Sequence, residues 1–217
     1  MTGTHAPARR TGRRRLIASV GTLLVAGTLV SSAAFVDQAN LNLGGAGIGF
    51  PYTFDIGVVL PDGTVEQADT DAGFDWTVDG SETLVPGGSV TTTIPVFNNT
   101  PTLSSDTVFK VVLRNGDGTV APGVPNITPF LRFTAQDQAG TALFTDATWD
   151  AASGAVGLLQ ARGSDALDAG ASYTAGAAGS EGTITLTINY LDAPGVEALN
   201  GGQAALAVRI DATSVTP

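Results

Sequence analysis

The segment TITLTINYL, residues 183–191, alternates apolar and polar side chains without a break. A period of two is typical of a β-strand with one buried and one solvated face. The alternation places four side chains on the buried face: Ile184, Leu186, Ile188 and Tyr190. This segment therefore predicts a strand of an antiparallel sheet.

The same pattern recurs along the chain. It is clear at 90–96, 109–113 and 206–211, and weaker at 52–60, 74–78, 130–135, 141–145 and 155–160. Frequent turn signals such as Pro61-Asp62-Gly63 and Pro86-Gly87-Gly88 separate these short segments. Such spacing is typical of a sandwich or jelly roll. We therefore expect an all-β fold, an antiparallel β-sandwich of jelly-roll type.

Two segments interrupt the pattern. Residues 151–182 are rich in Ala, Gly and Ser, and we expect a long loop there that could hold one or two short helices. Pro95 lies within the strand pattern of residues 90–96 and cannot donate a ladder hydrogen bond. That strand is therefore expected at a sheet edge or at a bulge, with an edge formed by Val90, Ile94, Pro95 and Val96.

The N-terminus has the order of a bacterial signal peptide. Five arginines between Arg9 and Arg15 precede an apolar run over 16–30 and small residues at 31–34. We predict cleavage after Ala34, with Ala33 as the neighbouring alternative. An uncleaved anchor is the competing interpretation, because residues 16–35 are just long enough to cross a bilayer, but several Gly, Thr and Ser residues dilute their hydrophobicity. A partial twin-arginine pattern leaves Sec and Tat export open.

The predicted cleavage makes the remaining chain strongly acidic. Residues 35–217 hold five basic and twenty acidic residues, a net charge of −15. Such an acidic surface repels nucleic acid and anionic lipid. We therefore expect no nucleic-acid partner, and contact with a membrane only during export. The chain has no Cys, and its stability must come from one hydrophobic core. The sequence predicts a signal peptide over 1–34, an arm over 35–49 and one β-sandwich domain over 50–217.

The side chains needed for most catalysis are missing after this cut. The only His is His5, in the signal segment, and no Cys exists to act as nucleophile or zinc ligand. Lys110 is the only lysine, and the pattern places it on a solvated strand face. Carboxylate pairs could hydrolyse glycosides, with Asp75 beside Trp76 and Asp150 beside Trp149 as the places to look. We expect these tryptophans to fill the core or to cap a sheet, and we predict that the chain is not an enzyme.

No cofactor is expected, although calcium is a candidate ligand. Asp69, Asp71 and Asp75 surround Gly73 in a run that could supply several hard oxygen ligands from one loop. The spacing is loose and no downstream Glu completes a helix-loop-helix site. A solvated acidic loop is the competing interpretation.

Three short motifs resemble a known family. They are Ala34-Phe35-Val36-Asp37, then Pro86-Gly87-Gly88-Ser89 leading to Asn98-Asn99-Thr100, and finally Asn200-Gly201-Gly202 before the last strand. In this order they are similar to the TasA/camelysin group of secreted biofilm-matrix proteins, whose precursors carry a SipW-type signal peptide. The resemblance implies a jelly-roll subunit that assembles by donating an N-terminal strand to its neighbour. The protease label attached to camelysin finds no support here, because the chain has no His to bind zinc.

The residues themselves supply both parts that such assembly needs. Residues 35–49 are rich in Gly and Asn and carry no strand pattern of their own, and Pro95 marks an edge. We expect Phe35, Val36, Leu41 and Leu43 to anchor this arm in a second copy of the chain. The leading hypothesis is a secreted fibre or matrix subunit, with other matrix components as further partners. A polysaccharide-binding adhesin and, third, a carboxylate hydrolase are the alternatives.

Overall fold

The computed structural model describes residues 53–70 and 73–215. This part of the chain consists of strands, loops and single 3-10 turns, and none of its helices is long and apolar enough to cross a membrane. The strands are β1 (Ile56–Val59), β2 (Val65–Glu66), β3 (Ser89–Asn98), β4 (Ser104–Leu113), β5 (Leu131–Gln136), β6 (Ala142–Ala147), β7 (Ser153–Leu159), β8 (Glu181–Tyr190) and β9 (Leu206–Val215). The 3-10 turns are η1 (Ser81–Thr83), η2 (Thr128–Phe130) and η3 (Val196–Leu199). The expected all-β fold is confirmed.

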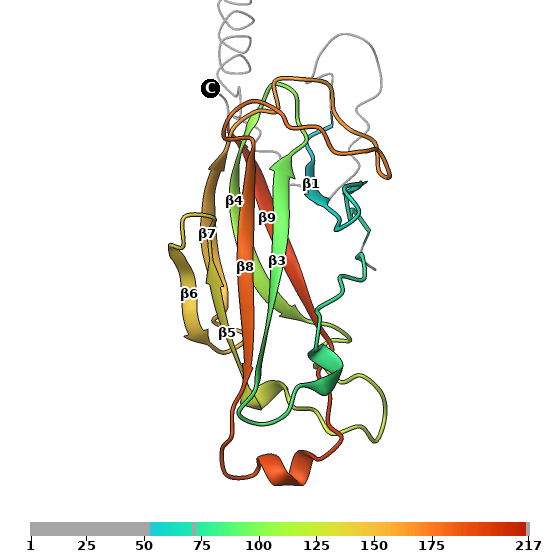
Figure 1. The fold of residues 1–217 in the computed structure, drawn as a ribbon, viewed down its shortest axis with the longest axis vertical. Coiled ribbons are helices and arrows are strands. Elements are labelled where there is room, and N and C mark those ends of the chain that lie inside the picture. The colour runs from blue at the N-terminus through green and yellow to red at the C-terminus, as the bar shows by residue number, and fades with distance from the viewer. Residues whose placement is uncertain (1–52, 71–72, 216–217) are drawn as a thin grey trace, which may run out of the picture. The chain divides into compact units, whose positions relative to one another are not determined.

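The strands form two antiparallel sheets that face each other as a sandwich. One sheet has six strands in the order β2-β1-β3-β8-β5-β6, and the other has three in the order β7-β4-β9. Figure 1 shows β7, β4 and β9 behind the layer that contains β5, β8 and β3. This arrangement is a β-sandwich, and its finer description as a jelly roll stays a prediction.

Strand β8 lies in the middle of the larger sheet and coincides with the segment that predicts the fold. It pairs with β3 from Phe97↔Glu181 to Ser89↔Asn189, and on its other side with β5. Ile184, Leu186 and Tyr190 are buried as the alternation predicts. Because both neighbours lie in register with it, β8 holds the larger sheet together.

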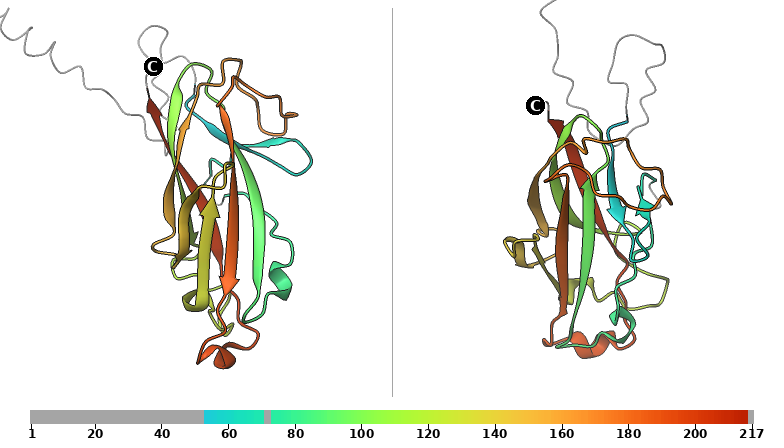
Figure 2. Two further views of the ribbon diagram at one scale, coloured as in Figure 1. Left: turned by 60° about the vertical axis from the view of Figure 1, so that its left-hand side comes forward. Right: turned by 45° about the horizontal axis from the view of Figure 1, so that its top comes forward.

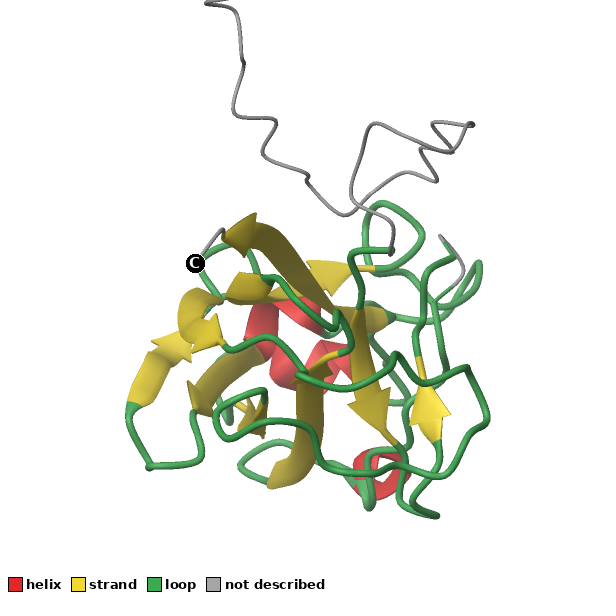
Figure 3. Ribbon diagram, turned by 90° about the horizontal axis from the view of Figure 1, so that it is seen from above, coloured by secondary structure: helices red, strands yellow, loops and turns green. Residues whose placement is uncertain are grey.

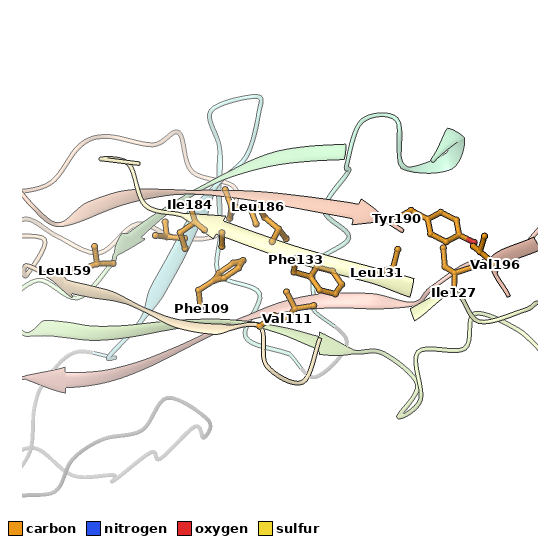
Figure 4. Packing of buried hydrophobic residues seen from close by; sticks show 14 residues of the cluster. Phe109, Val111, Ile127, Leu131, Phe133, Leu159, Ile184, Leu186, Tyr190 and Val196 are labelled. Carbon is orange, nitrogen blue, oxygen red and sulfur yellow. The ribbon is translucent and has the colours of Figure 1, made fainter. Parts of the chain in front are cut away.

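The core fills the space between the two layers. Figure 4 shows Phe109 and Val111 from the smaller sheet pointing toward Phe133 and Ile184 from the larger one. Phe109 also stacks on Phe144, with ring centroids 6.2 Å apart. Aromatic and branched aliphatic side chains therefore supply the burial that the absence of disulfides requires.

One expected strand is missing. Residues 74–78 form no strand, and this segment is held beside β3 by the Trp76 side chain. The long loop expected within residues 151–182 is present over 160–180, after β7, and it contains no helix. Gly163, Gly170 and Gly179 in this loop all have left-handed backbone conformations, which interrupt a right-handed helix.

The two edges of the smaller sheet differ. Strand β7 carries a bulge opposite Thr107 and Val108 and lies against β6 of the other sheet. Gly154 permits this approach, because a Cβ atom there would lie 2.5 Å from the carbonyl oxygen of Leu143. Strand β9 pairs with β4 over its whole length without a register shift, and no other strand of the described residues pairs with it.

Candidate functional site

Strand β3 has a neighbour on both sides at one end only. It pairs with β8 from Ser89 to Phe97, whereas β1 pairs with it only at Val96, Phe97 and Asn98. Within the described residues, no strand pairs with the β1 side of residues 89–95. We call this stretch the open β3 edge.

Pro95 lies where the pairing with β1 stops. The Asn98 amide donates to the Ser180 carbonyl at 2.8 Å, and the Asn99 amide donates to the Asp55 carbonyl at 2.9 Å. Since these bonds alternate along an antiparallel ladder, even-numbered residues of β3 face β8 and odd-numbered ones face β1. At position 95, the backbone amide of any other residue would donate to β1, but proline has no N–H. The pairing with β1 ends at Val58↔Val96.

The four residues expected to form an acceptor edge have different positions. Val90, Ile94 and Val96 point into the sandwich, where Ile94 and Val96 are fully buried. Val96 also pairs with Val58, so it is not part of the open edge. An incoming strand would therefore meet backbone groups of residues 89–95 rather than these apolar side chains.

A tryptophan closes the core beside this edge. The Trp76 indole Nε1 donates to Thr92 Oγ1 at 2.9 Å, and the half-buried ring packs against the core. Asp75, its neighbour, accepts from Arg114 at 3.3 Å. These contacts use side chains, and no backbone hydrogen bond joins the described residues of this segment to the open β3 edge.

At the other end of β3, a loop covers the outer face of the larger sheet. Residues 160–180 run across the strand ends at this end of the sandwich (Figure 1), and the view from above shows loops covering the strand ends (Figure 3). Figure 2 shows this loop beside the β1-β2 hairpin, to which it is joined by the bond from the Val65 amide to the Ala171 carbonyl at 2.9 Å. Phe97 lies beneath the loop and is fully buried. Gly57 makes room for this ring, since a Cβ atom there would lie 2.4 Å from Phe97 Cζ.

Arg162 fixes the loop from within. Its side chain is 1% exposed, and its Cζ lies 5.5 Å from the centroid of the Phe97 ring and 5.8 Å from that of Tyr173. Its Nε donates to the Asp165 carbonyl at 3.0 Å, and Nη2 donates to the Thr174 carbonyl at 2.5 Å. Carbonyl oxygens and aromatic faces thus stabilise a buried cation.

Tyr173 links this loop to β8 beside a shallow hollow. Its hydroxyl donates to Glu181 Oε2. Burial, together with the hydrogen bond to Glu181 and the charge of Glu181, raises the pKa of Tyr173 to about 12. Both residues line a hollow of about 230 Å³ that also touches Val59, Pro95 and Thr183. The hollow therefore lies where the pairing of β1 with β3 ends.

The turn after β3 is built from buried polar side chains. Asn98 Nδ2 donates to the Leu103 carbonyl at 2.8 Å, and Asn99 Nδ2 donates to Asp55 Oδ2 at 2.7 Å. Thr100 Oγ1 accepts from the Asp55 amide at 2.9 Å. The family-like motif Asn98-Asn99-Thr100 is therefore a structural turn that locks β1 against β3.

Several predicted features lie outside the described residues. These are the signal segment 1–34 with its cut after Ala34, and the arm over 35–49 with Phe35, Val36, Leu41 and Leu43. They stay predictions.

The candidate calcium ligands are only partly described. Asp71 lies outside the described residues, and Asp75 bonds to Arg114. Burial and the negative charge of Glu66 raise the pKa of Asp69. No group of three or more acidic or His residues within 53–70 and 73–215 lies close enough to hold a metal ion. A calcium site at these residues stays a prediction.

The remaining candidate residues lie apart from the open β3 edge in sequence and serve other contacts. Trp149 is 37% exposed, which differs from the buried position expected for it, and Asp150 beside it is exposed. Hydrogen bonding from Thr148 lowers the pKa of Asp150. Lys110 is not simply solvated, because its Nζ lies 2.6 Å from Asp211 Oδ2.

Comparison with known proteins assigns no relative. No protein-family model matches the chain, and no curated protein matches it significantly. The function therefore has to be argued from the residues and the strand edges described above.

Proposed function

We propose that this chain is a secreted structural subunit of extracellular fibres or biofilm matrix, which assembles when its N-terminal arm adds as a strand to a neighbouring copy. The observation that carries the proposal is the open β3 edge, at which backbone groups face outward inside an otherwise paired sheet. An extended peptide can add to such an edge by main-chain hydrogen bonds. The donor would be residues 35–49, and the subunit would have the jelly-roll fold that the family resemblance implies.

The direction of the backbone groups defines what the edge can accept. Ser89, Thr91 and Thr93 direct their amides and carbonyls away from β8, and Pro95 offers a carbonyl only. A donated strand would therefore pair with residues 89–93 and end at Pro95, next to the hollow beside Tyr173. The signal cut would control assembly, because it frees the arm.

The first test compares protein that starts at Phe35 with protein that starts at Gly49. Sedimentation velocity and negative-stain microscopy, with and without calcium, measure assembly. We expect fibres from the longer protein alone. Unaltered assembly without residues 35–48 would contradict the role of the arm.

A proline substitution then tests the acceptor. Thr91→Pro removes an outward amide that the described part of the domain does not use, so the fold should persist while assembly is lost. Thr91→Val keeps the amide and serves as the control that should still assemble. Assembly of the Thr91→Pro protein would show that the arm binds elsewhere.

A polysaccharide-binding adhesin is the second candidate, and the exposure of Trp149 favours it. Exposed aromatic rings are suitable platforms for sugar rings. Trp149→Ala should then abolish retention on insoluble polysaccharide, whereas Val85→Ala, at another exposed apolar side chain, should not. Equal retention of both variants would exclude Trp149 as the platform.

A further inference from the structure

Strand β9 presents a second unpaired edge, which is longer than the open β3 edge. It pairs with β4 from Ser104↔Val215 to Leu113↔Leu206, and no strand of the described residues lies on its other side. The Arg114 amide donates to the Ala205 carbonyl at 2.9 Å, so odd-numbered residues of β9 bond to β4. The outward backbone groups belong to five residues: Leu206, Val208, Ile210, Ala212 and Ser214.

The core is less well covered along this edge than one strand further in. Phe109 and Val111 on β4 are fully buried, whereas Val208 and Ile210, which face them from β9, are only partly buried. All four side chains lie on the core side of the smaller sheet. An added strand beside β9 would therefore cover apolar surface as well as pair the backbone.

The sequence of β9 is complementary to itself about Ile210. In an antiparallel pair of two copies with Ile210 opposite Ile210, Val208 faces Ala212 and Leu206 faces Ser214. These are the residues whose backbone groups point outward, so every pair would exchange hydrogen bonds. The core-facing side chains of the two copies would also lie on one side of the joined sheet.

The charges select this register over its neighbours. Arg209 and Asp211 lie on the outer face, and centring the pair on Ile210 places each opposite the other in the partner. A shift that centres the pair on Arg209 would oppose two guanidinium groups, and one that centres it on Asp211 would oppose two carboxylates. Like charges directly opposite each other destabilise a strand pair, so only the Ile210 register brings together opposite charges.

Within one copy the same groups are already ordered. Arg209 Nε donates to Asp211 Oδ1 at 2.6 Å, and Lys110 Nζ donates to Asp211 Oδ2 at 2.6 Å. The second copy would thus meet side chains that are held on the outer face, with less conformational freedom to lose.

We infer that β9 is a self-pairing edge, along which two copies of this chain associate antiparallel with Ile210 opposite Ile210. The result is one continuous six-stranded sheet made from the two three-stranded sheets. This interface is separate from the arm and from the open β3 edge, so it goes beyond the proposed function and does not depend on it. In a fibre it would join subunits side by side.

Charge reversal tests the pairing. The complete chain is expressed in a secreting host, and the released protein is studied by sedimentation velocity over a range of concentrations. In the proposed pair of copies, position 209 of each chain faces position 211 of the other. Arg209→Asp therefore places carboxylates opposite carboxylates, and Asp211→Arg places cations opposite cations. Each variant alone should dimerise about tenfold or more weakly than the parent, because two cross-strand pairs change sign.

An equal mixture of the two variants is the deciding sample. Each cation then faces a carboxylate in the other chain, so dimers should return close to parental affinity. This recovery also shows that both variants are folded. Unchanged dimerisation of the single variants, a parent that stays monomeric, or a mixture that stays monomeric would each overturn the inference.

Cysteine cross-linking tests the register, since the chain has no Cys of its own. Ala207 faces Thr213 of the second copy in the proposed register, at a non-hydrogen-bonded pair whose Cα atoms are about 4.5 Å apart, which suits a disulfide. Ala207→Cys mixed with Thr213→Cys should give a heterodimer far above the statistical share, and each variant alone should give little. Cross-linking that is as efficient within each single variant would contradict the register.

Discussion

Strands β7 and β9 are the two edges of the same three-stranded sheet, and they are protected very differently. Strand β7 has a bulge, two internal glycines, and a neighbour in β6. Strand β9 is straight in register, has ten residues, and contains neither proline nor lysine. Natural proteins blunt edges by bulges, charges or covering segments. Strand β7 has a bulge and a covering strand, whereas the charges on β9, Arg209 and Asp211, are opposite and paired, so β7 is a protected edge and β9 is an available one.

This contrast indicates that the sandwich is closed on one side and left open on the other. At the β7 side, Gly154 lets β6 and β7 approach so closely that nothing larger than hydrogen fits. At the other side lie both β9 and the open β3 edge, without a joining strand in the described residues. Unused edges on one side are what an assembling subunit needs, and what a monomeric protein avoids.

Proline substitutions at two adjacent positions of β9 should give the largest difference in stability, because only one of the two amides is used within the chain. Ala207→Pro removes an amide that bonds to β4 and should lower the free energy of unfolding by about 3 kcal/mol or more. Val208→Pro removes an outward amide together with part of a core-facing side chain, so it should lower the free energy of unfolding by less than about 1 kcal/mol relative to Val208→Ala, because the described part of the chain does not use that amide. Urea unfolding of these variants at low protein concentration measures the difference. Equal losses would mean that β9 is paired on both sides.

Filling the gap between β6 and β7 should have the next largest effect. Gly154→Ala forces a Cβ atom against the Leu143 carbonyl, and we expect a loss of about 1 to 3 kcal/mol. Gly182→Ala is the matched control, because its Cβ would lie 3.6 Å from the nearest side-chain atom and needs no shift. Thermal unfolding should separate the two variants. If both behave like the parent, the β6-β7 side is not tightly packed.

The smallest effect concerns the charges on β9. Partial burial raises the pKa of Asp211, but hydrogen bonds from Arg209 and Lys110 and their charges outweigh this and hold the pKa below its ordinary value of 3.8. A carboxyl with a depressed folded-state pKa stabilises the fold above its unfolded pKa, and this stabilisation is lost as the pH falls through the folded value.

Asp211→Asn should therefore be slightly less stable than the parent at pH 7, and the difference should vanish as the pH falls below about 4. Unfolding curves from pH 7 to pH 2 measure this convergence. The exposed Asp79→Asn variant provides the control for a general charge effect. A difference that persists at pH 2 would show that Asp211 acts by packing rather than by its charge.

Local periodicity predicts best the strands that have one face buried in the core and one face in solvent. The alternation at 183–191 and 206–211 corresponds to β8 and β9, because each strand has one face on the core. Residues 74–78 show how this reasoning fails. Their side chains alternate between apolar and polar as in a strand, yet the Trp76 side chain bonds to Thr92 and the backbone forms no ladder. This contact joins residues that are distant in the sequence, so the local pattern cannot predict it.

The candidate sites were less visible in the sequence. Pro95 signals the end of a ladder, because its missing amide is a property of one residue. Which strands lie at the edges depends on the order of the sheet, so nothing local distinguishes β9 from an internal strand. Arg162 gives no signal either, since arginine is usually exposed and the ring that it packs on, Phe97, comes from a distant part of the chain.

The burial of Arg162 also bears on the resistance of the folded chain to proteases. After the predicted cut, trypsin-like proteases have five cleavage sites, and only Arg162 lies in the long loop over 160–180. Exposed loops are where proteases usually nick a folded domain first. Here the only cleavable side chain of that loop packs against two aromatic rings and is 1% exposed. The packing of Arg162 that holds the loop in shape thus also keeps trypsin-like proteases from cleaving the loop.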